Sequence, residues 1–456
     1  MVNEKIFRAY DVRGKYPDEI NEDVAYLIGR AFATVFCKQG VSVTVAVGGD
    51  ARLSTPSIKQ SLIKGLTDSG ANVVDIGMVP TPVVYFACYN AGYDYGIAVT
   101  GSHLAKGNNG LKFSDPNGIP IGFDEGLSKI MQLVKSRKFR EVPKSKKGRV
   151  SKADVSADYI KFMSSLFPTS LKDVRIVVDG ANGAAGQLYS EVFRKCGADV
   201  VEMYCEPDGN FPNHTPDPMD SEFIVDLQAK VKQTKANLGV AFDGDGDRIN
   251  IVDERGSVID TNHIFSLMIE DGLEESKGAA IVHDVLCSKL VDDVIVAAGG
   301  NPITWKVGHT NIAKKCFGEG ALMAGEVSGH YFFKEANYAD DVLVAGLKIL
   351  KIMKRTGKKL SELTVKYPKF YSFGDRIAVK DEEKFGFIEQ LKEKLASQGF
   401  NIITMDGVRV DFENGWMLFR PSNTEAKISM GYESSDKQEF DRIKQLADDI
   451  IKTIPK

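Results

Sequence analysis

Residues Leu238–Asp253 read LGVAFDGDGDRINIVD, in which an acidic, glycine-containing loop separates two apolar runs. The runs Leu238–Phe242 and Ile249–Val252 have the length and composition of buried strands. The loop between them carries three carboxylates, on Asp243, Asp245 and Asp247. Carboxylates this close repel one another unless a cation lies between them, and their oxygens suit a hard divalent cation such as Mg²⁺. The stretch therefore predicts a strand–loop–strand unit that binds a divalent metal.

Two other interpretations of this loop compete with a metal site that meets phosphate. An EF-hand loop also alternates carboxylates, but Arg248 occupies the sixth position, where that loop needs glycine. The flanking runs are also typical of strands rather than of the EF-hand's helices. An acidic surface turn between two strands is the simpler alternative, and the loop alone leaves it open. Arg248 favours the metal site, because a guanidinium is suited to phosphate.

The composition is that of an ordinary globular protein. The chain has 456 residues, enough for about three or four domains, with 43% hydrophobic and 26% charged residues. A formal net charge of −4 gives no reason to expect nucleic acid as a partner. The six cysteines form no C-x-x-C pair, and the N-terminus lacks the apolar core of a signal peptide, so we expect a cytoplasmic protein. No stretch approaches the 18 apolar residues of a membrane span, so no membrane partner is expected.

One segment, Lys135–Lys152, is strongly basic, with nine Lys or Arg residues and a single acid, Glu141. Pro143, Ser145 and Gly148 within it predict a solvated linker rather than a nucleic-acid surface. This linker marks the first expected domain boundary, near residue 148.

A strand–helix–strand unit occurs three times along the chain. Each unit has an apolar strand, a helical pattern, a glycine where the helix ends, and a second strand. The first strands of the three units are Val43–Asp50, Val174–Gly180 and Ala279–Asp284. Such units build mixed or parallel sheets covered by helices, so three related α/β domains are expected. From about Phe370 the pattern changes to an α+β module. Its expected strands are Asp375–Lys380, Asn401–Met405, Gly407–Phe412 and Gly415–Arg420, and its expected helices are Lys384–Gln398 and Lys437–Thr453. The domains are therefore placed at residues 1–147, 148–252, 253–366 and 367–456.

Other polar motifs follow apolar runs. The strand Tyr95–Val99 opens into a loop with Ser102, where a serine is placed as a nucleophile or as a helix N-cap. The G-x-S-x-G elbow of serine hydrolases is absent, because Leu104 stands where the second glycine should be. Lys112 follows in reach of the loop as a proton carrier or electrostatic clamp.

Two further loops could bind a phosphorylated sugar. Gly325–His330 presents donors and acceptors, as sugar hydroxyls require, although a polar turn is the simpler interpretation. Arg420–Glu425 joins a guanidinium to hydroxyls and an amide and could hold phosphate, or it could be a capped helix start. Near the N-terminus, Arg8 and Arg13 lie in a segment too polar for the core.

Together these motifs resemble those of the α-D-phosphohexomutase family, and within it the bacterial phosphomannomutase/phosphoglucomutase group. The resemblance covers the whole chain, and the motifs follow the family's order. The serine motif T-[AG]-S-H-N-P is matched at Thr100–His103, the metal motif D-G-D-G-D-R at 243–248, the sugar motif G-E-x-S-G-H at 325–330 and the phosphate motif R-x-S-N-T-E at 420–425. The turn at Gly308-His309 is similar to the sugar-recognition turn of the mannose and glucose enzymes. The resemblance implies four domains around a central cleft.

The family implies a role for each motif. Ser102 would be the phosphoserine and, with Asp243, Asp245 and Asp247, a ligand of Mg²⁺. The residues implied in catalysis are Ser102, His103, Lys112, Arg13, Arg248 and His330. Those implied in substrate binding are Arg8, Tyr10, Gly308, His309, Glu326, Ser328, Arg420, Ser422, Asn423 and Thr424.

The implied reaction is reversible phosphoryl transfer between the 1- and 6-positions of mannose or glucose phosphate. It would pass through a phosphoserine enzyme and a hexose 1,6-bisphosphate, and the fourth domain would close over the site through a hinge near residues 366–370. Water must be kept from phosphoserine, which is the reason to expect closure.

Three residues depart from the family's pattern. Leu104 and Ala105 replace Asn-Pro, so the serine loop lacks a residue that fixes φ. Leu286 stands where relatives often place a lysine that contacts substrate. A phosphoglucosamine mutase, a Mg²⁺-dependent sugar phosphatase and a non-catalytic sugar-phosphate binding protein remain as alternatives, and Gly101 with the Gly308-His309 turn argues against the first.

Overall fold

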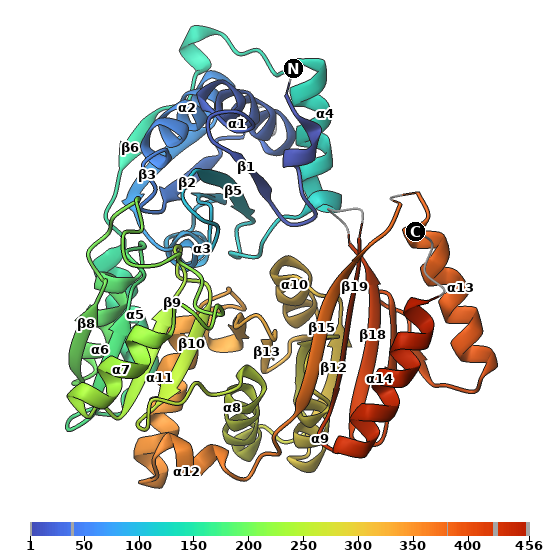
Figure 1. Ribbon diagram of the computed structural model, residues 1–456. Coiled ribbons are helices and arrows are strands. Elements are labelled where there is room, and N and C mark those ends of the chain that lie inside the picture. Colours follow the sequence, from blue (N-terminus) through green and yellow to red (C-terminus); the bar gives the residue numbers. More distant parts are fainter. Residues whose placement is uncertain (1, 38–40, 381, 423–426, 453–456) are drawn as a thin grey trace.

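Four β-sheets follow one another along the chain in this computed structural model, and each sheet with its helices forms one domain (Figure 1). The structure describes residues 2–37, 41–380, 382–422 and 427–452. The first domain, blue to cyan, is at the top of Figure 1, and the fourth, orange to red, is at the right.

The first domain has a mixed six-stranded sheet in the order β1-β5-β4-β2-β3-β6. Its strands are β1 (Val12–Lys15), β2 (Thr44–Gly49), β3 (Asn72–Met78), β4 (Tyr95–Val99), β5 (Asn108–Ser114) and β6 (Val150–Lys152). Its helices are α1 (Glu22–Phe36), α2 (Thr55–Asp68), α3 (Thr81–Ala91) and α4 (Ser128–Ser136). The basic segment expected as a linker is therefore partly strand, because β6 pairs in parallel with β3 through Val73 and Val150.

The second and third domains each have a mixed four-stranded sheet, in the orders β10-β9-β7-β8 and β12-β11-β13-β14. The strands are β7 (Arg175–Asp179), β8 (Asp199–Met203), β9 (Leu238–Phe242), β10 (Ile249–Asp253), β11 (Ala280–Asp284), β12 (Asn301–Trp305), β13 (Met323–Gly325) and β14 (Tyr331–Phe333). The helices of this part are α5 (Ser156–Leu166), α6 (Gly186–Lys195), α7 (Val225–Thr234), α8 (Thr261–Glu275), α9 (Lys289–Ala297), α10 (His309–Glu319), α11 (Val342–Thr356) and α12 (Leu360–Thr364).

The threefold repeat predicted from the sequence is confirmed. In each repeat the strand, the helix and the next strand form a parallel crossover, as β2–α2–β3, β7–α6–β8 and β11–α9–β12. Gly70, Gly197 and Gly299, which follow the three helices, have φ of +95°, +101° and +80°, the left-handed region that glycine occupies without strain. Beyond the crossover, each sheet adds one parallel strand and then one antiparallel strand: β4 and β5, β9 and β10, β13 and β14. The three domains thus share one topology.

The fourth domain is an antiparallel sheet in the order β15-β19-β18-β17-β16, covered on one face by two helices. Its elements are β15 (Tyr371–Ala378), α13 (Lys384–Ser397), β16 (Ile402–Ile403), β17 (Val408–Asp411), β18 (Gly415–Pro421), β19 (Lys427–Ser434) and α14 (Lys437–Ile451). The sequence pattern predicted all of these except β19. This strand lies between β15 and β18 and pairs with both, so the sheet depends on it.

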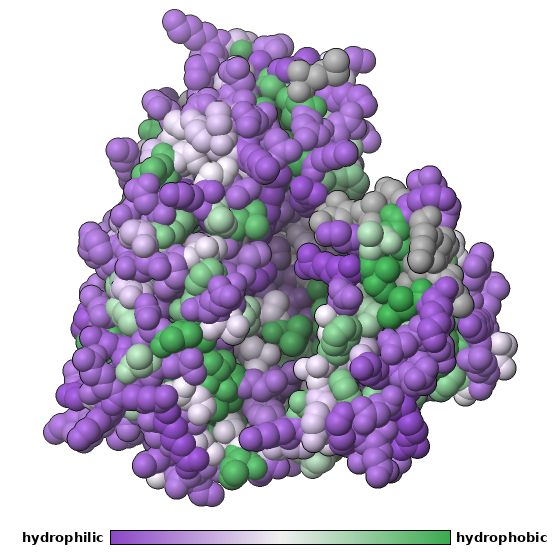
Figure 2. Space-filling model, in the orientation of Figure 1, coloured by the Kyte–Doolittle hydropathy of each residue, from purple (hydrophilic) through white to green (hydrophobic). Residues whose placement is uncertain are grey.

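The apolar core is divided unequally among the domains. One cluster runs without interruption from the first domain through the second and third, and includes Phe86, Tyr189 and Leu347. The fourth domain has its own cluster, with Phe387, Met417 and Ile443. Figure 2 shows the surface hollowed between the first and fourth domains. Within the described residues, no helix has both the length and the apolar character needed to cross a membrane.

Candidate active site

The serine loop and the metal loop meet at the border of the first two domains. Ser102 lies in the loop between β4 and β5 and is 1% exposed, with its backbone in the left-handed region at φ 51°. Asp243 lies in the loop between β9 and β10. The Ser102 hydroxyl donates to Asp243 Oδ2 at 3.1 Å, across 141 residues of sequence. The two motifs identified separately in the sequence therefore form one site.

The three aspartates of the metal loop are fully buried, which excludes the acidic surface turn. The EF-hand is excluded as well, because strands β9 and β10 flank the loop. One carboxylate oxygen of each aspartate lies within 4.8 Å of the others. Asp245 Oδ1 and Asp247 Oδ1 find no hydrogen-bond partner among the described residues, although burial makes an unpaired acceptor costly. Buried oxygen ligands with unused lone pairs fit a divalent cation.

Lys112 on β5 lies against this acidic cluster. Its ammonium donates to Asp245 Oδ2 at 2.8 Å and to Asp247 Oδ2. Burial favours the neutral amine, but the two carboxylates raise the pKa of Lys112 well above its ordinary value. Burial likewise opposes ionisation of Asp245 and Asp247, yet Lys112 lowers the pKa of both. Lys112 is therefore held as a cation beside the metal loop.

Asp243 is not bonded to Lys112, and the charges of Lys112 and Arg248 do not offset the effect of burial on its pKa. Burial, together with the charges of Asp245 and Asp247, raises the pKa of Asp243 well above its ordinary value. Its Oδ1 accepts the backbone N–H groups of Asp247 at 2.9 Å and Arg248 at 3.2 Å. The carboxyl that faces Ser102 is thus the one that benefits most from an added cation.

Two histidines and two arginines complete this end of the site. His103 Nδ1 lies 3.2 Å from Ser102 Oγ, and burial lowers the pKa of His103 to about 2. Burial lowers the pKa of His330 to about 3, so both rings are neutral at neutral pH. Arg248 Nε donates to His330 Nε2 at 3.0 Å, which places the proton of the neutral ring on Nδ1. Burial opposes the charge of Arg13, but Asp11, bonded at 2.6 Å, raises the pKa of Arg13.

The predicted sugar loop joins β13 to β14 and faces the start of α10. Glu326 Oε1 accepts the Gly308 N–H at 2.7 Å, and burial raises the pKa of Glu326 well above its ordinary value. Gly308 has φ 116°, and a Cβ there would lie 2.3 Å from Tyr10 Cζ, so only glycine fits. The Tyr10 hydroxyl donates to Val307 O at 2.7 Å. His309 stacks on His330 with ring centroids 5.6 Å apart, which links this turn to Arg248 at the end of the metal loop.

The remaining predicted residues belong to three other segments: the sugar loop, the stretch before β1 and the phosphate motif. Ser328 and Arg8 are partly buried, on the sugar loop and just before β1 respectively. Arg420, the last residue but one of β18, lies on the cleft face of the fourth sheet and pairs with Asp406 at 3.2 Å. Ser422 N–H donates to Lys427 O at 2.9 Å, which continues the antiparallel pairing of β18 with β19 on either side of the undescribed residues. Asn423 and Thr424 lie outside the described residues.

Several buried polar residues of the site escaped the sequence analysis. Arg52 and Asp50, which follow β2, hold the serine loop, and the Thr81 hydroxyl at the start of α3 donates to Asp245 Oδ2 at 2.6 Å. Asp340 is fully buried, with Oδ2 at 2.7 Å from His330 Nδ1. Arg52 could have been found from the sequence, because Asp50 and Arg52 form a charged pair directly after an apolar strand, as the charged residues of the metal loop do. Asp340 and Thr81 gave no signal beyond residue type.

Comparison with known proteins agrees with this geometry. The alpha/beta/alpha domains I, II and III of the phosphoglucomutase/phosphomannomutase family match residues 4–141, 157–256 and 260–370. The C-terminal domain of the same family matches residues 376–450. The four matches follow the order of the four sheets.

Relatives match over nearly their full length. The chain is 39% identical to a phosphomannomutase/phosphoglucomutase of Pseudomonas putida, covering 97% of this chain and 94% of the relative. It is 35% identical to a phosphoglucomutase of Neisseria gonorrhoeae, covering 100% and 98%. The crystal structure of a phosphoglucomutase/phosphomannomutase family protein from Burkholderia thailandensis superposes with a TM-score of 0.91 at 35% identity, covering 99% and 98%. The chain therefore belongs to the phosphoglucomutase/phosphomannomutase family.

Proposed function

We propose that this protein is a phosphohexomutase that moves a phosphoryl group between the 1- and 6-positions of mannose or glucose phosphate. The observation that carries the proposal is the contact between Ser102 Oγ and Asp243 Oδ2 at 3.1 Å, which joins a buried nucleophile to a buried metal-binding cluster. Membership of the family and the names of full-length relatives support the same activity. The hexose 1,6-bisphosphate is proposed as the intermediate.

We assign Mg²⁺ to the cluster of Asp243, Asp245 and Asp247, with Ser102 as the fourth protein ligand. An all-oxygen set of ligands favours a hard cation, and two of its buried oxygens lack partners within the described part of the chain. When bound, Mg²⁺ would supply Lewis-acid polarisation of a phosphoryl oxygen.

The residues around Ser102 suit phosphoryl transfer. In the forward half-reaction, the bond from phosphorus to Ser102 Oγ breaks, a bond to a hexose hydroxyl oxygen forms, and the hydroxyl proton leaves to a base. Arg13, Lys112 and Arg248 would neutralise charge on the transferring group, since this chemistry depends mainly on positioning and electrostatics. Among Lys112, Arg13 and His330, the candidates for proton transfer, carboxylates hold the first two as cations. Burial keeps His330 neutral, and its Nε2 could accept a proton only after releasing its bond from Arg248.

The far side of the cleft would hold the rest of the substrate. Glu326, Ser328 and His309 would bind sugar hydroxyls, with Arg8, Tyr10 and Gly308 shaping the turn beside them. Arg420, Ser422, Asn423 and Thr424 would bind the phosphate that is not reacting. A donor-rich clamp opposite the serine allows the bisphosphate to turn over and react through its other end.

We further propose that the fourth domain closes over the bound sugar through a hinge near residues 366–370. Leu286 and Arg420 line one cavity on the cleft face of the fourth sheet, so closure would bring both against the substrate. We keep the domain boundaries proposed from the sequence, at 147, 252 and 366, although β6 pairs with the first sheet after residue 148 and β10 extends to Asp253.

The test begins with intact-mass analysis of the purified protein. We expect a phosphate-sized adduct that maps to Ser102, and a Ser102→Ala variant that folds normally but turns over at least a thousandfold more slowly. Normal activity in Ser102→Ala would contradict the phosphoserine mechanism.

Coupled assays with glucose 1-phosphate, mannose 1-phosphate and glucosamine 1-phosphate, run in parallel, identify the sugar. Preference for glucosamine 1-phosphate would identify the alternative phosphoglucosamine mutase. Stoichiometric release of inorganic phosphate would identify a phosphatase, and tight binding without turnover a binding protein.

A further inference from the structure

Arg52 lies behind the serine loop, with its side chain buried and away from the cleft. The residue is 3% exposed and follows β2. Its donors reach Asp50 Oδ2 at 3.0 Å, Ala105 O at 3.0 Å, Asn108 O at 3.1 Å, Ser102 O at 2.7 Å and Leu104 O. A guanidinium has five N–H donors, so all donors of Arg52 are used. Four of the five bonds go to backbone carbonyls of residues 102–108.

The guanidinium of Arg52 lies at the point toward which these carbonyls turn. Carbonyl oxygens turned toward one point repel one another, and a fork of fixed donors compensates four of them at once. The strands β4 and β5 hold the two ends of the loop, through Val99 paired with Leu111. Between these ends the loop has Leu104 and Ala105, and neither residue restricts φ as a proline would. The conformation of the loop therefore depends on Arg52.

The same contacts fix the direction of the Ser102 side chain. The Ser102 carbonyl accepts from Arg52, and the Ser102 N–H donates to Thr100 Oγ1 at 2.7 Å. The Thr100 hydroxyl in turn donates to Asp50 Oδ2 at 2.8 Å, the oxygen that also accepts from Arg52. Both peptide groups that flank the Ser102 Cα are thus tied to one ion pair. Ser102 itself has φ 51°, a conformation uncommon for residues other than glycine, which persists only when its surroundings hold it.

Arg52 also connects the serine loop to the second domain. The ring of Phe211 covers the guanidinium, with Arg52 Cζ 5.0 Å from the ring centroid. Gly209 packs so closely that a Cβ there would lie 2.5 Å from Ala51 O. On the other side of the loop, a Cβ on Gly244 of the metal loop would lie 2.8 Å from Ser102 O. The loop is held between Arg52 and the metal loop.

We propose that Arg52 is a positioning residue: through the backbone of residues 102–108 it sets the position of Ser102 Oγ relative to Asp243, without touching substrate. The inference rests on the proposed phosphoryl transfer at Ser102. A displacement of about 1 Å at a reacting atom can cost on the order of a hundredfold in rate. Loss of this support should therefore lower kcat while substrate binding, which uses other loops, changes little.

The test compares Arg52→Lys with Arg30→Lys in the full-length protein with Mg²⁺. Lysine keeps the charge of Arg52 but offers three donors for five acceptors. Arg30 is a matched control because its guanidinium also bonds within the first domain, to Ser69 Oγ at 2.9 Å and Arg140 O at 3.1 Å, away from the serine loop. We expect Arg52→Lys to lower kcat about ten- to a hundredfold, counted per Ser102 that carries phosphate by intact mass, with KM within about threefold. Arg30→Lys should retain wild-type kcat.

Three results would overturn the inference. One is a kcat for Arg52→Lys within twofold of wild type; another is a rise in KM at unchanged kcat; the third is an equal fall in kcat for both variants. If Arg52→Lys does not fold, the test uses Asp50→Asn, which weakens the ion pair that holds Arg52 and should also lower kcat. An unchanged kcat in Asp50→Asn would also overturn the inference. Wild-type protein without mutase activity would instead refute the proposed function, so the two failures are distinguishable.

Discussion

Asp243, Asp245 and Asp247 carry the same side chain in three different surroundings. Asp245 and Asp247 each accept from Lys112, whereas Asp243 accepts only neutral donors, from Ser102 and two backbone N–H groups. Without a metal, loss of the Asp243 charge removes its repulsion with the carboxylates of Asp245 and Asp247. Loss of the Asp247 charge instead removes one of the two carboxylates that balance the buried ammonium of Lys112. Residues with identical roles toward a metal should thus differ in what they contribute to folding.

We therefore expect opposite effects on the metal-free protein. In chelator, Asp243→Asn should leave the free energy of unfolding unchanged or higher, and Asp247→Asn should lower it by roughly 1–3 kcal/mol. With Mg²⁺ added, both should lose the stabilisation that the wild type gains by binding metal. Urea unfolding with and without Mg²⁺ measures this. If both variants keep the full response to Mg²⁺, the metal assignment is wrong, and if both fall equally in chelator, the contrast is wrong.

The sequence revealed those residues whose type and spacing carry chemistry. The aspartates, Ser102 and Glu326 stand in short loops after apolar strands, so their placement followed from local pattern. Arg52 acts through backbone carbonyls 50 or more residues further along the chain, and Asp340 acts through the ring of His330 on a neighbouring strand end; neither contact leaves a local pattern. Whether such residues contribute to the site depends on tertiary packing, which cannot be seen in a single sequence.

At the scale of elements, the hairpin β18–β19 shows where prediction from pattern failed. In β19, Ile428, Met430 and Tyr432 alternate toward the helices, but Ser429 and Gly431 on the cleft face are small and are poor strand formers. Pairing with the neighbouring strands β15 and β18 stabilises β19 although its own sequence is only weakly typical of a strand. The parallel crossovers were predictable because strand, helix and terminal glycine each left its own signal.

Arg420 on this hairpin should be sensitive even to conservative change. A guanidinium can meet phosphate through paired N–H donors, a geometry that lysine does not reproduce. Arg420→Ala should lose roughly 1.5–3 kcal/mol of transition-state binding, or about ten- to a hundredfold in kcat/KM, with Arg420→Lys in between. Steady-state kinetics with a hexose 1-phosphate measures the loss, while intact mass should show that Ser102 remains phosphorylated. An unchanged kcat/KM in Arg420→Ala would rule out the phosphate clamp.

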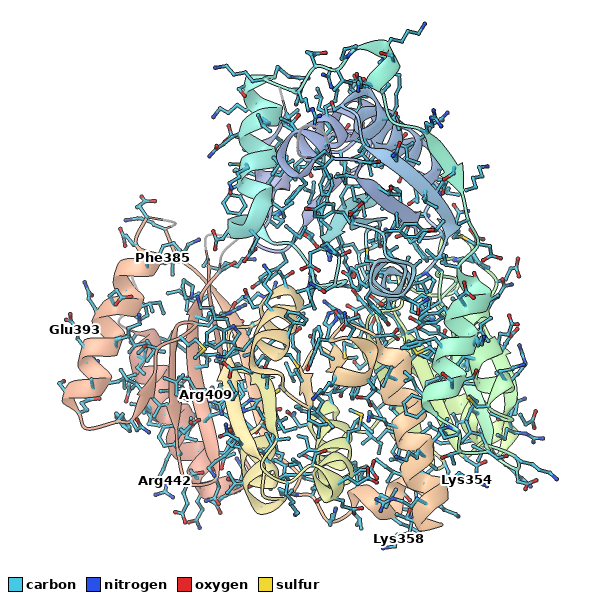
Figure 3. The ribbon with its side chains drawn as sticks, turned by 180° about the vertical axis from the view of Figure 1, so that it is seen from behind. Lys354, Lys358, Phe385, Glu393, Arg409 and Arg442 are labelled. Carbon is cyan, nitrogen blue, oxygen red and sulfur yellow. The ribbon has the colours of Figure 1, made fainter. Side chains whose placement is uncertain are left out.

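On the scale of the whole molecule, the fourth domain has a separate core and touches the third domain through a small patch. The buried apolar part of the patch consists of Val285, Trp416 and Leu418, with Arg409 donating to Cys287 O at 3.0 Å and the Val307 N–H donating to Asp406 Oδ2 at 3.2 Å. Figure 3 shows Arg409 at the border between the fourth sheet and the third domain. Glu433 lies in the same patch, and burial raises its pKa to about 7, while the hydroxyl of Ser288 works in the opposite direction. A patch this small, with an acid that favours its neutral form, suits a domain that moves.

The contribution of Glu433 to stability should depend on pH. The pKa of Glu433 is higher in the folded protein than in the unfolded chain, so the protonated form favours folding. This contribution to stability is fully present at a pH below the pKa of the unfolded chain, and it is lost as the pH rises through about 7. The shift corresponds to roughly 3 kcal/mol at most, so Glu433→Gln should be more stable than wild type at pH 8.5 by up to that amount, and no more stable at pH 4.5. Urea unfolding at both pH values measures the difference, with Glu413→Gln, an exposed position in the same domain, as control. A difference that does not change with pH would contradict the assignment.

The shared topology of the first three domains has a consequence for their origin. The serine loop, the metal loop and the sugar loop each join the same two strands of the repeat: β4 to β5, β9 to β10 and β13 to β14. The proposed nucleophile, metal ligands and sugar-binding residues thus occupy one equivalent hairpin in three copies. Three copies of one topology, each with a different polar loop at the same hairpin, are what duplication of one ancestral unit would give. The proposed active site is, in that sense, assembled from one loop position used three times.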